Sequence, residues 1–554
     1  LSNTTITQCI RDHETPDTRH KNSKVVHYKF DPRAAGETKI SAGDSVYDLE
    51  NDQDFGTILE LDTTKGTAAI KLKGKATEYE TVDLALAPKT ITGALTESID
   101  RFLTHVGELN LTPSQLEKRS YPYSPLIDIL LKANPTFKTQ VKSIVTSPSH
   151  QPEFTTELLK ATLNLANSYL FMQGPPGTGK TYHGAKLALG LMRHGMSVGL
   201  TSNSHKAINN FLRELDEQAV ASGNNQVKAT KKAEQANPQT HYEPSPDNPD
   251  SRVTNVWKNN QLEITPGALI AGTPWAFVAP EFDQALDYLI VDEASQLSIA
   301  HLVASGVSAK NIILIGDPRQ LPQPLQGQHL AELDKSPLEL LLGDDAVVPP
   351  HRGVFLETSR RMHTEICGVL SKHVYDNKLQ APPENARHAI HNPNPQLITK
   401  NAGLLYLAVE HTRRVSVAPE EITMISKLVD ELRHCSFESS KGEVTPLTPS
   451  DIMIVAPYNL QVRALKEAIP DVRIGTIDLF QGQQAPVTIL SMTTSDVNEA
   501  PRGIEFLFST NRVNVALSRA QALAIVVASP ELLRARCRTP EQMRLVNFFC
   551  AVAS

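Results

Sequence analysis

The chain has 554 residues, of which 40% are hydrophobic and 21% are charged, and its formal net charge at pH 7 is −7. These values fit a globular protein of about three or four domains, and no run of about 18 apolar residues is present that could form a membrane-spanning helix. The five cysteines are scattered, without a Cys-x-x-Cys pair, which argues against a structural zinc or iron–sulfur site and favours a reducing cytoplasm. The negative charge does not exclude a nucleic-acid partner, because phosphate binding needs only a local basic groove.

The N-terminal part of the chain divides into three segments. Residues 1–40 are polar and predict a linker or domain edge. Within residues 41–90, short β-type runs at 43–46, 56–61 and 66–72 alternate with turn residues and predict a small β-barrel. Residues 91–150 predict a helical accessory region that is broken by prolines.

Apolar runs alternate with helical stretches from residue 168 onward. The first series of strands is expected at 169–172, 197–201, 268–272, 288–291 and 311–315, and the second at 404–409, 451–456, 487–492 and 522–528. These runs lack polar alternation, which is typical of parallel strands buried on both faces. The sequence therefore predicts an α/β protein with two parallel-sheet domains, 151–344 and 345–554, and a polar inserted loop at about 223–262.

The strongest chemical signal is a glycine-rich segment between an expected strand and an expected helix. It reads Gly174-Pro175-Pro176-Gly177-Thr178-Gly179-Lys180-Thr181. Glycines let backbone N–H groups turn toward phosphates, and the start of the helix adds partial positive charge. We therefore expect a nucleotide phosphate site in which Lys180 reaches the β- and γ-phosphates and the Thr181 hydroxyl binds Mg²⁺.

Two further polar segments follow expected strands. Asp292 and Glu293 come directly after an apolar strand, where Asp292 can hold the Mg²⁺ shell and Glu293 can polarise an attacking water. Gln320 lies in Gly-Asp-Pro-Arg-Gln after the next strand, and its amide can sense the γ-phosphate. Together with the phosphate loop, these residues predict ATP and Mg²⁺ as cofactors.

Three more segments are weak signals alone. They are Thr-Ser-Arg-Arg-Met-His at 358–363, Ile-Gly-Thr-Ile-Asp-Leu-Phe-Gln-Gly-Gln-Gln at 474–484, and Asn-Val-Ala-Leu-Ser-Arg-Ala at 514–520. In this order and spacing, the six segments resemble the superfamily 1 helicases, in the branch of the nonsense-mediated-decay helicase and the replication helicase–nuclease. The resemblance implies two RecA-like motor domains preceded by an accessory barrel.

The resemblance also assigns roles to individual residues. Arg361 resembles the arginine that reaches the γ-phosphate from the second motor domain, and Arg519 resembles the arginine finger. Nucleic-acid contacts are implied for four residues, namely Ser202, Ser204, His205 and Thr273. For Trp275 and Phe277, core packing is favoured over base stacking.

The sequence departs from the family around the base and the sugar. The glutamine that reads adenine upstream of the phosphate loop in the family has no clear counterpart, because Gln151 is too distant. Arg360 replaces the aromatic residue expected next to the adenine, and Gln484 replaces the acidic residue expected near the ribose. Arg360 and Gln484 remain the candidates for those positions.

The sequence therefore predicts an ATP-dependent helicase or translocase on single-stranded nucleic acid, with DNA expected rather than RNA. The resemblance implies 5′-to-3′ movement. A nucleotide-gated clamp without strand separation and an unrelated P-loop enzyme, such as a small-molecule kinase, are the alternatives. We also expect a RecB-like nuclease domain upstream in the parent protein, and a surface turn without nuclease activity at Asp376-Asn377-Lys378.

Overall fold

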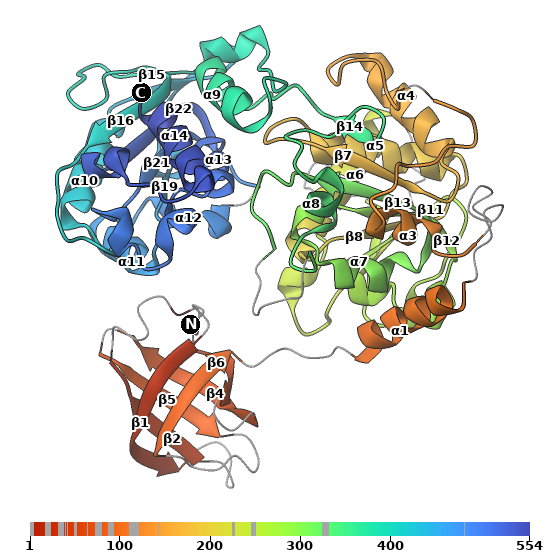
Figure 1. Ribbon diagram of the computed structural model, residues 1–554, viewed down its shortest axis with the longest axis horizontal. Coiled ribbons are helices and arrows are strands. Elements are labelled where there is room, and N and C mark those ends of the chain that lie inside the picture. The colour runs from red at the N-terminus through yellow and green to blue at the C-terminus, as the bar shows by residue number, and fades with distance from the viewer. Residues whose placement is uncertain are drawn as a thin grey trace.

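The structure is a computed structural model, and Figure 1 shows a barrel and two α/β bodies. The structure describes the chain except for residues 1–4, 17–23, 32–37, 39, 41, 49–52, 64, 73–79, 87–92, 110–120, 142, 224–227, 245–250, 324–331 and 481. Among the described helices, none is long and apolar enough to cross a bilayer. The expected α/β architecture with a preceding barrel is confirmed.

The barrel is closed and antiparallel, with the strand order β1-β2-β5-β4-β3-β6. Its strands are β1 (Thr5–Pro16), β2 (Lys24–Lys29), β3 (Ser45–Asp48), β4 (Gln53–Asp62), β5 (Thr67–Leu72) and β6 (Thr81–Leu86). The prediction of a linker at residues 1–40 is therefore wrong, because β1 and β2 belong to the barrel. These strands bury mainly one face, through Ile6, Cys9, Val26 and Tyr28, so polar residues outnumber apolar ones and hide the β pattern.

The accessory region is less helical than predicted. It contains α1 (Gly93–Glu108) and α3 (Ser124–Leu130), whereas the described residues from 131 to 150 form mainly turns and bends. Helix α1 packs on α7 (Ile299–Gly306), where the Ser98 hydroxyl donates to the Ala304 carbonyl oxygen at 2.7 Å. The accessory helices are thus attached to the first α/β body.

The first α/β body has an eight-stranded parallel sheet in the order β10-β9-β11-β8-β12-β13-β7-β14. Its strands are β7 (Tyr169–Gln173), β8 (Val198–Thr201), β9 (Lys228–Lys232), β10 (Val253–Val256), β11 (Ala268–Gly272), β12 (Leu286–Val291), β13 (Ala309–Gly316) and β14 (Gly353–Phe355). All five expected strands of this series are present.

Two expectations about this body need correction. The segment 223–262 is not simply a loop, because β9 and β10 extend the sheet, and their polar sequences suit a sheet edge that is only partly buried. The first sheet also continues past the expected boundary at residue 344, because β14 pairs with β7. Strand β14 is short and follows two prolines, so its sequence looks like a linker.

Helices cover both faces of the first sheet. One face packs against α4 (Pro152–Leu163), α5 (Lys180–Arg193) and α6 (His205–Ala221), and the other against α3, α7 and α8 (Pro337–Leu342). Successive strand residues alternate between the two cores, as shown by Leu170 and Met172 in one core and Tyr169 and Phe171 in the other. Phe277 is fully buried in the second of these cores, which confirms core packing for this residue.

The second α/β body has a five-stranded parallel sheet in the order β16-β22-β21-β19-β20. Its strands are β16 (Gly403–Ala408), β19 (Ile452–Val455), β20 (Arg473–Gly475), β21 (Ala485–Ser491) and β22 (Ala520–Ala528). The surrounding helices are α9 (Thr364–Val374), α10 (Pro419–Leu432), α11 (Asn459–Ala468), α12 (Gly503–Leu507), α13 (Thr510–Leu517) and α14 (Pro540–Ala553). A small antiparallel sheet contains β15 (Ala389–His391), β17 (Ser436–Glu438) and β18 (Val444–Pro446).

Candidate active site

The glycine-rich loop joins β7 to α5 and requires glycine at three positions. A Cβ on Gly174 would lie 2.2 Å from Lys180 Cγ, and one on Gly177 would lie 2.5 Å from Arg361 Cβ. Gly177 and Gly179 also have φ angles of 76° and 80°, in the region that glycine adopts without strain. Lys180 Nζ donates to the Gly174 carbonyl oxygen at 2.8 Å, so the ammonium lies against its own loop.

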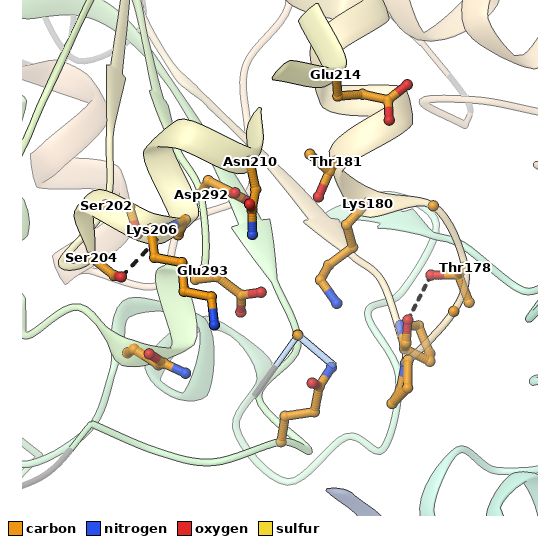
Figure 2. Close-up of a pocket in the computed structure, with 18 of the residues that line it drawn as sticks. Thr178, Lys180, Thr181, Ser202, Ser204, Lys206, Asn210, Glu214, Asp292 and Glu293 are labelled. Carbon is orange, nitrogen blue, oxygen red and sulfur yellow. Dashed lines mark hydrogen bonds between the residues drawn. The ribbon is translucent and has the colours of Figure 1, made fainter. Parts of the chain in front are cut away.

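The proline and threonine residues give this loop its shape. The Thr178 hydroxyl donates to the Pro175 carbonyl oxygen at 2.8 Å, as Figure 2 shows. The Pro176 carbonyl oxygen accepts from the Ser359 hydroxyl at 2.8 Å, although these residues are 183 positions apart in the chain. The loop is therefore held both internally and by the segment that precedes α9.

The acidic pair follows β12 and faces the loop. Asp292 is 4% exposed, and its Oδ1 has no hydrogen-bond partner in the described part of the chain. Burial, reinforced by the Glu293 carboxylate, raises the pKa of Asp292 to about 7, while Lys180 acts in the opposite direction. Thr181 lines the same cavity. A buried carboxylate oxygen and a threonine hydroxyl fit Mg²⁺, which takes few protein ligands and completes its shell with phosphate and water.

This raised pKa predicts a pH-dependent metal affinity. Because Mg²⁺ binds the ionised carboxylate, protons compete with the metal below about pH 7. We expect the Mg²⁺ affinity of the ADP-bound protein to fall by up to about tenfold per pH unit below that value. Calorimetric titration of Mg²⁺ at about pH 6 and about pH 8 measures this difference. Equal affinities at the two pH values would show that Asp292 does not hold the metal.

Gln320 lies just after β13 in a buried hydrogen-bond network. Its Nε2 donates to Asp317 Oδ2 at 3.0 Å, and the Tyr375 hydroxyl donates to the same oxygen at 2.7 Å. Asn514 Nδ2 donates to the Tyr375 hydroxyl oxygen and to the Arg319 carbonyl oxygen, both at 2.8 Å. Since Asn514 belongs to α13, the network joins the segment after β13 to a helix of the second body.

Arg519 is the first of two cations that the second body contributes to the site. Its side chain is buried, with a residue exposure of 1%. Nε donates to the Val515 carbonyl oxygen at 3.0 Å, and one terminal nitrogen donates to the Gln483 carbonyl oxygen at 3.2 Å. Burial lowers the pKa of Arg519 to about 10, and Glu293 acts in the opposite direction. Arg519 therefore carries a poorly solvated charge close to the acidic pair.

Arg361 is the second of these cations, and it is partly buried. Its Nε donates to Gln484 Oε1 at 2.8 Å, and a terminal nitrogen donates to the Ser518 carbonyl oxygen at 3.2 Å. Burial, followed by the charge of Arg519, lowers the pKa of Arg361 to about 9. Like Arg519, Arg361 bonds to neutral oxygens, and a phosphate would offset the cost of removing both charges from water. Gln484 holds this arginine in place.

These side chains meet in one cavity of about 570 Å³ between the two bodies. Figure 2 shows Lys180 and Thr178 from the loop on one side, with Asp292 and Glu293 opposite. The cavity is lined by residues of the phosphate loop, by Asp292, Glu293 and Gln320, and by Arg361 and Arg519. The predicted catalytic residues are thus brought together, although they come from segments far apart in the sequence.

Arg360 takes a different position from Arg361. Its backbone N–H donates to the Gly177 carbonyl oxygen at 2.9 Å, but its exposed side chain lines a separate cavity with His150. The positive charge of Arg360 contributes, after burial and Lys186, to lowering the pKa of His183 to about 4. Arg360 thus starts at the edge of the phosphate loop and points away from the phosphate cavity.

The expected nucleic-acid contacts lie at the carboxyl ends of β8 and β11. Ser202 and Ser204 line the main cavity, and Ser204 caps α6 by accepting from a backbone N–H. His205 Nδ1 lies 3.2 Å from Lys231 Nζ, and burial and this neighbour lower the pKa of His205 to about 4. Thr273 directly follows β11 and precedes a short turn of helix.

Sequence reasoning missed some residues of the site. Lys206, Asn210 and Glu214 of α6 all line the cavity, and their spacing of four residues, typical of one helix face, was the available signal. Tyr375 gave no signal, because its hydroxyl contacts depend on segments that are distant in sequence. The turn after it, Asp376-Asn377-Lys378, is exposed and has positive φ at Asp376 and Asn377, as expected for a surface turn.

Comparisons with known proteins agree with this arrangement. Two family models, each described as an AAA domain, match residues 155–341 and 333–531. The DNA replication ATP-dependent helicase/nuclease DNA2 of Gallus gallus is 27% identical over 385 residues, which are 67% of this chain and 35% of that protein. The putative helicase mov-10-B.1 of Danio rerio is 27% identical over 49% of this chain and 29% of that protein. The 5'-3' DNA helicase ZGRF1 of Mus musculus is 28% identical over 46% of this chain and 13% of that protein.

The chain spans about a third of the length of the first of these relatives. The two family models together match residues 155–531, which include all six segments. The resemblance to superfamily 1 helicases that these segments predict is confirmed, since the matched relatives are named as helicases.

Proposed function

We propose that this chain is an ATP-dependent helicase or translocase that moves along single-stranded nucleic acid. The observation that carries the proposal is the meeting of Arg361 and Arg519 of the second body with Lys180, Asp292 and Glu293 of the first in one cavity. A nucleotide bound there would contact both bodies. Its hydrolysis would therefore change how strongly the two bodies are held together.

Each residue has a defined part in the proposed reaction. Lys180 and the backbone N–H groups of the loop bind the phosphates, and Glu293 orients and polarises the attacking water. Asp292 and Thr181 would hold Mg²⁺, which neutralises phosphate charge when bound. Arg361 and Arg519 stabilise the negative charge that develops in the transition state. These two cations come from the second body, so turnover requires the bodies to be close together.

The network around Gln320 couples phosphate contact to the second body. Gln320 and Tyr375 donate to the same carboxylate, that of Asp317, and Asn514 binds Tyr375 from α13. Loss of the γ-phosphate would remove the contacts of Gln320 and Arg519 together. Repeated closing and opening would then move the two α/β bodies along a nucleic-acid strand that is held at the carboxyl ends of β8 and β11.

Arg360 is our candidate for the adenine contact. A guanidinium plane can stack on a π system, so arginine is able to replace the aromatic residue of the family. The backbone N–H of Arg360 donates to the Gly177 carbonyl oxygen, so its side chain begins next to the phosphate loop.

The substrate and the polarity of movement are further parts of the proposal. DNA is favoured over RNA, and 5′-to-3′ movement is favoured, because two relatives are named as a DNA replication helicase/nuclease and a 5'-3' DNA helicase. We also propose a nuclease domain as an upstream partner in the parent protein, following the first of these names. Backbone contacts make binding independent of sequence and sensitive to salt.

ATPase measurements with different nucleic acids test this function. We expect single-stranded DNA to stimulate hydrolysis strongly, RNA to stimulate it less, and blunt duplex to have little effect. The same protein should separate a duplex that carries a 5′ single-stranded tail, measured by release of a labelled strand. The matched control is the same duplex with a 3′ tail.

Three outcomes would change the proposal. ATP hydrolysis without stimulation by any nucleic acid would favour an unrelated P-loop enzyme. Stimulated hydrolysis without strand release or movement on a single strand would favour a nucleotide-gated clamp. Strand release only from the 3′-tailed duplex would reverse the proposed polarity.

A further inference from the structure

The carboxyl edge of the first sheet continues beyond the expected nucleic-acid contacts. The register pairs Gly272 with Thr201, Lys231 with Ala271, and Val256 with Lys232. The chain therefore leaves β8, β11, β9 and β10 side by side, at Ser202, Thr273, Ala233 and Trp257 respectively. Adjacent strands are about 4.8 Å apart, so this row extends roughly 14 Å from β8 to β10.

Two aromatic rings stand at the far end of the row. The centroids of the His241 and Trp257 rings lie 4.8 Å apart, and both side chains are partly exposed. The segment carrying His241 is fixed from two sides. Asn209 of α6 donates to the His241 carbonyl oxygen at 2.7 Å, and Asn255 of β10 bonds to both backbone groups of Tyr242, at 3.0 and 2.9 Å. The rings thus form a braced aromatic surface at the sheet edge.

Positive charge accompanies the rings. Lys231 is fully buried, and its ammonium contacts the Thr240 carbonyl oxygen and the His205 ring, which are both neutral partners. Burial, followed by the charge of Lys232, lowers the pKa of Lys231 to about 8. Lys232 is partly exposed at the end of β9, and Lys258 is exposed next to Trp257. These lysines bring positive charge to the region between the start of α6 and the rings, where the Glu234 carboxylate also acts on His205.

We propose that His241 and Trp257 form a base-stacking subsite for single-stranded nucleic acid, with Lys232 and Lys258 as phosphate contacts. Aromatic faces beside lysines match the two parts of a single strand, its bases and its phosphates. The subsite lengthens the strand path by continuing the row from Ser202 and Thr273. This inference rests on the proposed function, and it assigns a ligand to the described part of the inserted segment.

The tryptophan content of the chain allows a direct test. The sequence has two tryptophans, and Trp275 lies partly buried, with its ring centroid 5.1 Å from that of His301. A Trp275→Phe variant therefore reports on Trp257 alone. We expect oligo-deoxythymidine to quench its fluorescence, whereas an abasic oligonucleotide of equal length should bind without the same quenching. The same quenching measurement with oligouridine shows whether RNA also binds at the subsite.

Substitution of Trp257 measures what the subsite contributes to binding. We expect Trp257→Ala to weaken binding of single-stranded oligonucleotides about tenfold, and Trp257→Phe, which keeps an aromatic face, to recover most of the affinity. Trp275→Phe is the matched control and should bind like the parent protein. Thermal unfolding of each variant checks that the fold is retained.

The results separate failure of the subsite from failure of the proposed function. If the parent protein binds single strands, but Trp257→Ala binds equally well and no quenching occurs, the subsite is wrong and the proposed function stands. If the abasic strand quenches as strongly as oligo-deoxythymidine, bases do not stack on Trp257 and the inference fails. If the parent protein binds no single strand, both proposals fail.

Discussion

Replacing Lys180 with alanine should abolish ATP hydrolysis while leaving the fold intact. The ammonium lies at the phosphate loop, 2.8 Å from the Gly174 carbonyl oxygen, and the side chain lines the cavity rather than an apolar core. Its loss removes the charge that pairs with the phosphates but creates no void among packed apolar residues. Steady-state ATPase activity with saturating single-stranded DNA measures the loss, and thermal unfolding checks the fold.

A matched control uses another helical lysine. Lys160 is exposed near the end of α4, and Lys160→Ala changes the net charge by the same amount outside the cavity. We expect this variant to hydrolyse ATP normally. Substantial nucleic-acid-dependent turnover by Lys180→Ala would show that the glycine-rich loop is not the nucleotide site.

Replacing Arg519 with alanine should lower turnover by about 10³-fold, with a smaller effect on ATP binding. Arg519 carries a buried charge close to Glu293, where transition-state charge would develop. Since binding energy for the ground state comes largely from the first body, kcat should fall more than ATP affinity. Single-turnover hydrolysis and binding of a fluorescent ATP analogue measure the two effects separately.

Two further variants sharpen the interpretation. Arg519→Lys keeps the charge but loses the forked geometry, so we expect little recovery of turnover. Arg534→Ala removes an arginine whose side chain is 77% exposed and should leave turnover unchanged. Normal hydrolysis by Arg519→Ala would mean that the second body does not complete the site, which would contradict the proposed mechanism.

The central strands of both sheets were predictable from the sequence, because they are buried on both faces and appear as unbroken apolar runs. Strands β9 and β10 were not predictable in this way, because β10 is the edge strand and β9, its neighbour, is buried only at alternate positions, so both need few apolar residues. Barrel strand β1 was missed because only every second residue faces the interior, and Arg11, Asp12 and His13 interrupt even that pattern.

The candidate site follows the same division. Lys180, Asp292 and Gln320 each come just after a buried parallel strand, and such strands end at a common edge of the sheet, so their meeting was predictable. Tyr375 was not predictable, because its hydroxyl joins Asp317 and Asn514, which are 58 and 139 positions away. Its position at the end of α9 is indistinguishable, in sequence, from that of a core tyrosine.

Helix α13 connects two parts of the site that have been described separately. It contains Asn514, which binds Tyr375, and it ends just before Arg519. Arg519 Nε also donates to the Val515 carbonyl oxygen within this helix, so we expect Asn514 and Arg519 to move together. Under the proposed mechanism, states in which only one of these two residues keeps its contact are therefore disfavoured. Each ATP molecule would then be hydrolysed only together with a movement of the two bodies. Helix α13 would in this way couple ATP hydrolysis to movement and limit hydrolysis when no nucleic acid is bound.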